Sequence, residues 1–130
     1  MTHASTAVAA SRAAMITPPD FFAALANDTR LRSLILLSRQ PELCVCELTH
    51  ALGLSQPHIS RHLAQLREAR LVSDRREGVW VYYRINRELP AWALHVLEKT
   101  AAGVASGEPF RDDAAALAEM PNRPGAARCA

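Results

Sequence analysis

The chain has 130 residues, a formal net charge of +2, 49% hydrophobic residues and 22% charged residues. This balance predicts one packed domain and excludes a disordered chain, a collagen or coiled-coil rod and a large multidomain enzyme. No apolar run approaches the roughly 18 residues that a membrane-spanning helix needs, so we expect no membrane partner.

Residues 1–16 are rich in alanine, serine and threonine and lack the apolar centre of a signal peptide. We therefore expect a flexible arm over 1–16 in a cytoplasmic protein, a folded domain over 17–102 and a partly disordered extension over 103–130. The first helix is predicted to start at Thr17, because two prolines and Asp20 follow it and are typical of a first turn.

The next two helices are predicted from caps, breakers and apolar spacing. Asn27 or Asp28 can cap a helix that ends before Pro41. A third helix starts with Leu43 or Val45 and ends at Gly53, a residue that favours helix termini.

The fourth predicted helix completes a helix-turn-helix. Ser55 is a good N-cap, Pro57 is tolerated in the first turn, and Ile59, Leu63 and Leu66 form one apolar stripe. The short turn before it contains glycine, as is typical of a helix-turn-helix.

After the helix-turn-helix, apolar and polar residues alternate in the spacing of a β-strand. Val79–Ile85 reads as a strand, 71–75 as its partner and Arg76-Glu77-Gly78 as the turn, which makes a wing directly after the helix-turn-helix. Pro90 opens a last amphipathic helix, and a short helix is predicted over 111–119. The fold class is therefore mainly α with a small β-hairpin wing, a winged helix-turn-helix.

Basic residues gather on these elements. Of the 15 basic residues only Lys99 is a lysine, and arginine is the cation that suits phosphate and guanine. The start of the second helix of a helix-turn-helix meets the major groove of double-stranded DNA, and a wing reaches backbone or minor groove. The candidate operator-binding residues are Ser55, Gln56, His58, Ser60, Arg61, Arg75 and Arg76.

Several runs in this order resemble ArsR/SmtB-type repressors. Phe22–Arg32 is similar to their opening helices, Leu54–Leu63 to their recognition helix and Arg75–Arg84 to their wing. The resemblance covers roughly 19–100 and implies a homodimer that represses transcription until an inducer binds. Family dimers pair through their first and last helices, which here implicates Phe21, Phe22, Leu25, Trp92 and Val96.

Three cysteines, Cys44, Cys46 and Cys129, are the candidate ligands of the inducer. The N-terminus of a helix lowers the pKa of a thiol, and thiolates select soft cations. We expect reduced thiols, because Cys44 and Cys46 lie too close in sequence for an ordinary structural disulfide.

The Cys-Val-Cys run at this place resembles family sensors of trivalent arsenic and antimony, so the resemblance implies that inducer. Other family members build a second metal site on the last helix, but here no Asp-x-His precedes His95 and Glu98, so we expect no structural zinc. Thr49 stands where those sensors carry a third cysteine. Cys129 or an exogenous thiol can supply the third sulfur. A methylated trivalent arsenical needs only two sulfurs and would bind without either. His50 is a possible ligand if the inducer is a divalent metal.

Three alternatives stay open. A cadmium/lead sensor of the same fold is one, although the N-terminal arm lacks the cysteines of that branch. A sensor of thiol oxidation and a nucleoid-type DNA binder without inducer are the others.

The spacing also predicts a mechanism. Residues i and i+2 of a helix point about 200° apart, so Cys44 and Cys46 cannot bind one ion from an intact turn. We therefore expect the ligand to favour an unwound start of this helix, which displaces Arg61 from DNA.

Overall fold

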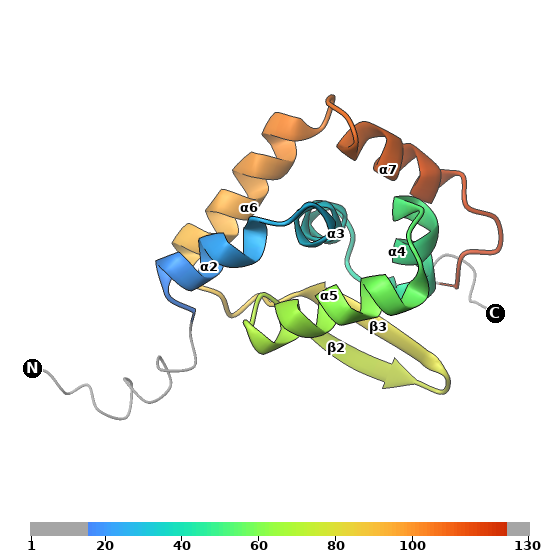
Figure 1. Cartoon of the computed structure of the whole chain (residues 1–130), viewed down its shortest axis with the longest axis horizontal. Helices are drawn as coiled ribbons and strands as arrows, with labels where there is room; N and C mark the ends of the chain where they lie inside the picture. The colour runs from blue at the N-terminus through green and yellow to red at the C-terminus, as the bar shows by residue number, and fades with distance from the viewer. Residues whose placement is uncertain (1–15, 125–130) are drawn as a thin grey trace, which may run out of the picture.

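Helix α3 (Asp28–Ser38) runs through the middle of the molecule, where Figure 1 shows it end-on. The computed structural model describes residues 16–124. Helices α2, α4, α5, α6 and α7 and strand β3 all contact α3. The other elements are α2 (Pro18–Leu25), β1 (Leu43–Cys44), α4 (Val45–Leu52), α5 (Gln56–Glu68), β2 (Val72–Glu77), β3 (Trp80–Ile85), α6 (Ala91–Val104) and α7 (Phe110–Ala118).

Side-chain caps begin three of the helices at the predicted places. Thr17 accepts the N–H of Asp20 at 3.3 Å, which satisfies one of the free donors at the start of α2. Asn27, rather than Asp28, caps α3 by accepting the N–H of Arg30 at 3.0 Å. Ser55 caps α5 in the same way.

The apolar stripes predicted for these helices form the core. Leu34 and Leu37 of α3 are fully buried, as are Ile59, Leu63 and Leu66 of α5. Each such side chain contributes roughly 1.5–3 kcal/mol of burial free energy. The recognition helix α5 is thereby fixed against α3 on one side, and its other side faces solvent.

The wing is part of a three-stranded antiparallel sheet with the order β1-β3-β2. Strand β2 runs to Glu77, further than expected, so Arg76 lies in the strand opposite Val81. The turn is Gly78 and Val79, and the φ of 62° at Gly78 favours glycine. Strand β1 has no counterpart in the sequence prediction, which placed its residues at a helix start.

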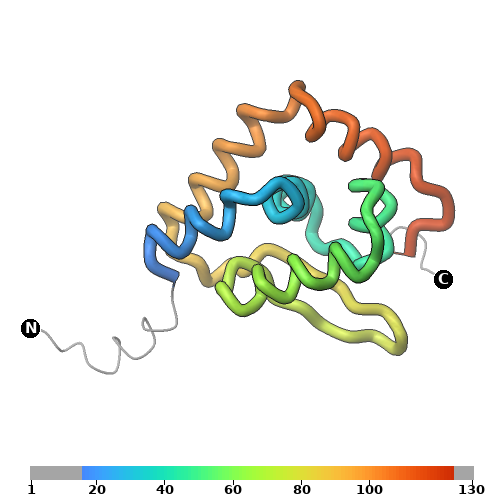
Figure 2. The backbone as a smooth tube through the Cα atoms, in the orientation of Figure 1, coloured from blue at the N-terminus to red at the C-terminus, as the bar shows by residue number. Residues whose placement is uncertain are grey.

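Two helices follow the wing and cover α3 and α4. Helix α6 begins after Pro90, as predicted, and continues to Val104. The predicted short helix is α7, which packs against α4 and α3, and Figure 2 shows these segments side by side. No helix within residues 16–124 is long and apolar enough to cross a membrane.

Candidate inducer site and nucleic-acid interface

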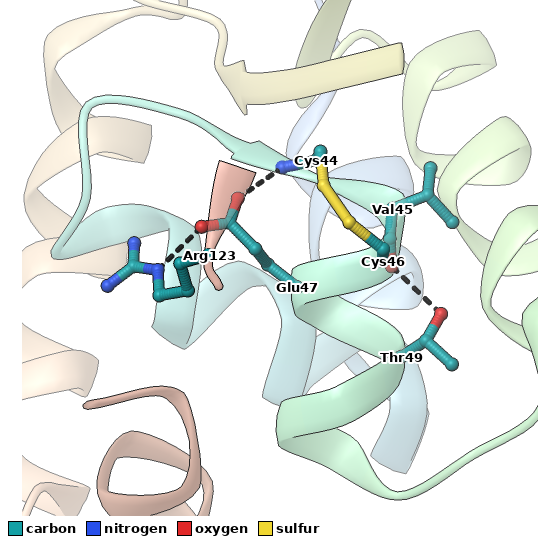
Figure 3. Close-up of a disulfide and its surroundings, with 6 residues drawn as sticks. All are labelled: Cys44, Val45, Cys46, Glu47, Thr49 and Arg123. Atoms are coloured by element: carbon teal, nitrogen blue, oxygen red, sulfur yellow. Dashed lines mark hydrogen bonds and ion pairs between the residues drawn. A yellow bond between two sulfur atoms is a disulfide. The ribbon is translucent and has the colours of Figure 1, made fainter. Parts of the chain in front are cut away.

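Cys44 and Cys46 meet at the junction of β1 and α4 (Figure 3). Their sulfurs are joined in a disulfide, with the two Cα atoms 5.4 Å apart. The expectation that these residues lie too close for a disulfide is therefore wrong. Cys44 is completely buried, and Cys46 is half-buried.

The backbone explains why the sulfurs meet. Cys44 is the N-cap of α4, with an extended conformation at φ −84° and ψ 163°, and only Cys46 is helical. The angle of about 200° between positions i and i+2 applies when both are helical, which is not the case here. The two sulfurs come together at an intact helix start, so the premise of the unwinding mechanism is wrong.

Glu47 holds this junction from inside the protein. Its carboxylate is completely buried and accepts the backbone N–H of Cys44 at 2.7 Å. Its other oxygen accepts Nε of Arg123 at 2.6 Å, in an ion pair that Figure 3 shows beside the cysteines. The partners are 76 positions apart, and sequence reasoning missed both because no local pattern joins them.

Other candidate ligands stand apart from the sulfurs. Thr49, at the position of the family's third cysteine, donates its hydroxyl to the Val45 carbonyl at 2.8 Å. His50 is exposed, and Cys129 lies outside the described residues. Within residues 16–124, no group of three or more histidine, cysteine or acidic side chains is placed to hold a metal ion.

Strand β1 connects the cysteines to the wing. Cys44 is paired with Tyr82 of β3. Glu42, just before β1, accepts two hydrogen bonds from Arg75 of β2, at 2.9 and 2.5 Å. These hydrogen bonds are the main cause that lowers the pKa of Glu42 and raises that of Arg75.

Arg75 therefore has partners on its own side of the sheet. It also pairs with Glu77 at 2.7 Å and lies over the ring of Tyr82, 4.4 Å from its centre. In this arrangement Arg75 joins the wing to the segment that leads into Cys44.

Other candidate DNA-binding residues face outward. Gln56, Arg61 and Arg76 are exposed, and within residues 16–124 neither Arg61 nor Arg76 takes part in an ion pair. Gln56 donates its amide to the hydroxyl of Ser60 at 2.7 Å. Ser55 is exposed and serves as the cap described above.

Two histidines join α5 to α3. Nε2 of His58 lies 2.9 Å from the hydroxyl of Thr29, and the ring of His62 is 4.9 Å from that of His58. Burial, followed by the nearby His58, Arg30 and Arg61, lowers the pKa of His62 below 6.5, so His62 is neutral at pH 7. His58 thus stabilises the position of α5 within the protomer.

The predicted dimer residues gather where α2 meets α6. Phe21 is buried and contacts Phe22 and Trp92 edge-on, with ring centres 5.2 and 5.1 Å apart. Phe22 and Trp92 are stacked and are 49% and 37% exposed. Leu25 and Val96 are half-buried and pack against the core. Exposed aromatic area of this kind marks interaction surfaces.

Known proteins are similar to this chain in sequence. The family described as bacterial regulatory protein, arsR family, matches residues 27–74. The arsenic resistance transcriptional regulator ArsR1 of Pseudomonas putida is 56% identical over 110 residues, which cover 85% of this chain and 84% of the relative. The arsenical resistance operon repressor of Escherichia coli is 50% identical over 84 residues, which cover 65% of this chain and 72% of the relative.

Solved structures agree with the sequence relatives. The crystal structure of the AntR antimony-specific transcriptional repressor is similar with a TM-score of 0.56 and 35% identity, over 68% of this chain and 77% of that one. These relatives are transcriptional regulators rather than enzymes, and their likeness confirms the predicted winged helix-turn-helix.

Proposed function

Because the chain belongs to the arsR family of bacterial regulatory proteins, we propose that it is a dimeric repressor that trivalent arsenic or antimony releases from operator DNA. The observation that carries this proposal is the pair of sulfurs at the junction of β1 and α4, where β1 belongs to the same sheet as the wing. We propose that it acts in the cytoplasm, where DNA is present and thiols are reduced.

The exposed side of α5 and the wing bind the operator in this proposal. Helix α5 enters the major groove, where Gln56 and Arg61 contact base edges and Ser60 supports Gln56. Arg76 contacts the phosphate backbone from the wing. A second protomer covers the exposed rings of Phe22 and Trp92, which places two copies of α5 on one operator.

The reduced cysteines bind the inducer. The thiolates of Cys44 and Cys46 supply two sulfurs, and trivalent arsenic takes a third. We propose Cys129 for this role because it follows Arg123 by 6 residues, which span at most roughly 20 Å when extended. The Glu47–Arg123 ion pair brings the chain close enough for that reach.

Inducer binding reaches the DNA-binding elements by two routes. One runs through the hydrogen bonds between β1 and β3, and the other runs along the chain from α4 to α5. Cys44 is paired with β3, so a displacement of Cys44 moves the wing. Cys46 lies in α4, which continues through Gly53 into α5. An inducer that binds the displaced arrangement more tightly shifts the population away from the DNA-binding one.

An operator-release titration of the reduced full-length protein tests the proposal. Arsenite and antimonite are expected to dissociate the complex, and Cys44→Ser or Cys46→Ser should abolish release while operator affinity stays within twofold. Cys129→Ser removes the third sulfur and retains two, so it should weaken release by arsenite without abolishing it, and an unchanged response would remove Cys129 from the site. Loss of operator binding in either of the first two variants, with folding intact, would contradict the assignment, and zinc and cadmium arms identify a divalent-metal sensor.

The disulfide favours a second candidate, a repressor that responds to thiol oxidation. Peroxide would then oxidise Cys44 and Cys46 and release the operator without any metalloid. Comparing release by peroxide with release by arsenite, on the same reduced protein, separates the two candidates.

A further inference from the structure

A pocket of about 450 Å³ opens beside Cys46, between the start of α4, helix α5 and the wing. It is a different surface from the aromatic patch of α2 and α6. Its lining residues are Val45, Cys46, Gln56, Ser60, Arg76, Val79, Trp80, Val81 and Tyr83.

The pocket has an apolar side next to the sulfur. Val81 and Tyr83 are two positions apart in β3 and therefore point to the same face of the sheet, and Val45 adjoins them from α4. An apolar cavity of about 150 Å³ is enough to hold a benzene molecule, so this pocket has room for a ring. The chemistry on this side suits a carbon group rather than an ion.

The two cysteines are placed differently with respect to this pocket. Cys44 is completely buried, whereas Cys46 is half-buried and lines the pocket. An arsenic atom bound to both sulfurs has one bond left. Because the Cys44 side is enclosed by protein, the open direction for a bulky third group is the pocket at Cys46.

We infer that this pocket receives the carbon substituent of a monosubstituted trivalent organoarsenical, R–As(OH)₂, whose arsenic is bound by Cys44 and Cys46. The inference rests on the proposed function, because it needs the same two sulfurs as inducer ligands. Two As–O bonds break and two As–S bonds form, and the two thiol protons leave with the hydroxides as two water molecules. No electrons are transferred, and a thiol or phosphine reductant first opens the disulfide.

The location of the substituent gives a direct effect on DNA binding. Gln56 and Ser60 of α5 line one side of the pocket, and Arg76 of the wing lines another. A group seated between them acts on both DNA-binding elements at once. Because the carbon group occupies the third bond of arsenic, an organoarsenical needs no third sulfur. Its response is independent of Cys129.

The test compares phenylarsine oxide with arsenite on the reduced full-length protein, with binding to the protein and release of the operator measured separately. Val81→Phe fills the pocket and is expected to raise the phenylarsine concentration for half-maximal binding at least tenfold, while the arsenite value stays within twofold. Val104→Phe is the matched control, because Val104 is also half-buried but does not line the pocket. It should change neither value.

Equal weakening of both ligands by Val81→Phe, or of neither, would overturn the inference. If circular dichroism shows that Val81→Phe does not fold, the wild-type protein decides: phenylarsine oxide must bind at least tenfold more tightly than its methyl analogue, and equal affinities overturn the inference. Selective binding of phenylarsine oxide without operator release supports the pocket and contradicts the proposed function, so the two failures are distinguishable.

Discussion

The two ends of α4 are both anchored by a buried carboxylate and an arginine, but the anchors come from different places. At the C-terminal end, Asp113 of α7 accepts two hydrogen bonds from Arg32 of α3, at 2.8 and 2.7 Å. Arg32 also donates to the Leu52 carbonyl at 3.1 Å. At the N-terminal end, Glu47 pairs with Arg123, in the segment that follows α7.

This difference predicts which end of α4 moves when the inducer binds. The C-terminal end is joined to two packed helices by a bidentate pair, a geometry that fixes orientation as well as distance. The N-terminal end is joined to one strand of the sheet and to a segment beyond the last described helix. We therefore expect the inducer to displace the cysteine end of α4 about a fixed C-terminal end.

The largest expected effect comes from breaking the fixed end. Asp113→Asn removes the charge opposite Arg32 and should lower the free energy of unfolding by about 2 kcal/mol, the range for a hydrogen bond to a buried charged group. Denaturant melts measure the loss. Half-maximal release by arsenite should stay within twofold, and a larger shift would show that this end also carries the signal.

The matching change at the movable end is Arg123→Gln. It replaces the cation beside the completely buried Glu47 carboxylate with a neutral amide that can still donate a hydrogen bond, so we expect a smaller loss of about 1 kcal/mol. Because the ion pair also holds the segment before Cys129 beside the two sulfurs, release by arsenite should need severalfold more inducer in this variant. Operator-release titrations of the wild type and the variant with arsenite check this, and equal half-maximal concentrations would show that Arg123 does not support the site.

A third change tests the C-terminal end of the neighbouring helix α5, which no ion pair of this kind anchors within residues 16–124 and where the backbone is strained. Arg70 follows this helix with a φ of 70°, a left-handed conformation that costs a residue with a side chain about 1 kcal/mol or more. Arg70→Gly should raise stability by roughly 0.5–1 kcal/mol, reduced by the greater freedom of glycine in the unfolded chain. A thermal melt measures it, and Arg70→Ala, which keeps the strain, is the control.

The smallest effect concerns the link between the wing and the cysteine end. Hydrogen bonds from Arg75 lower the pKa of Glu42 below its ordinary value of 4.5. The stability from this pair is therefore complete above pH 4.5 and is lost as the pH falls through the lower pKa of the folded state. The difference between wild type and Glu42→Gln should follow that course, and a difference that persists at low pH would assign it to packing instead.

Local signals predicted most of the fold. Asn27 and Ser55 accept free backbone N–H groups at helix starts, and Gly53 takes the left-handed conformation that ends α4. Each acts on residues within a few positions of itself, so the effect is visible in the sequence. The hairpin was equally visible from the alternation in β3. The turn was misplaced by one or two residues, which is the usual uncertainty of an element boundary.

The sequence names Cys44 and Cys46 as candidate inducer ligands, which stays a prediction, but it misses how the structure places them. Strand β1 has only two residues and exists because Tyr82 and Tyr83 pair with it, so no local period announces it. That pairing makes Cys44 extended and brings its sulfur to Cys46. The Glu47–Arg123 pair escaped for a similar reason, because contacts between distant positions leave no spacing to detect.

Strand β1 lies at the edge of its sheet, and this position has a consequence for engineering. The hairpin formed by β2 and β3 has its own pairing, so the ligand residues lie on elements separate from the hairpin and from helix α5. Replacing Cys44 and Cys46, within the segment 44–46, with other ligand groups would change what the protein detects while the recognition helix and the hairpin keep their residues. A library restricted to that short segment is thus a small and rational search space for new biosensors.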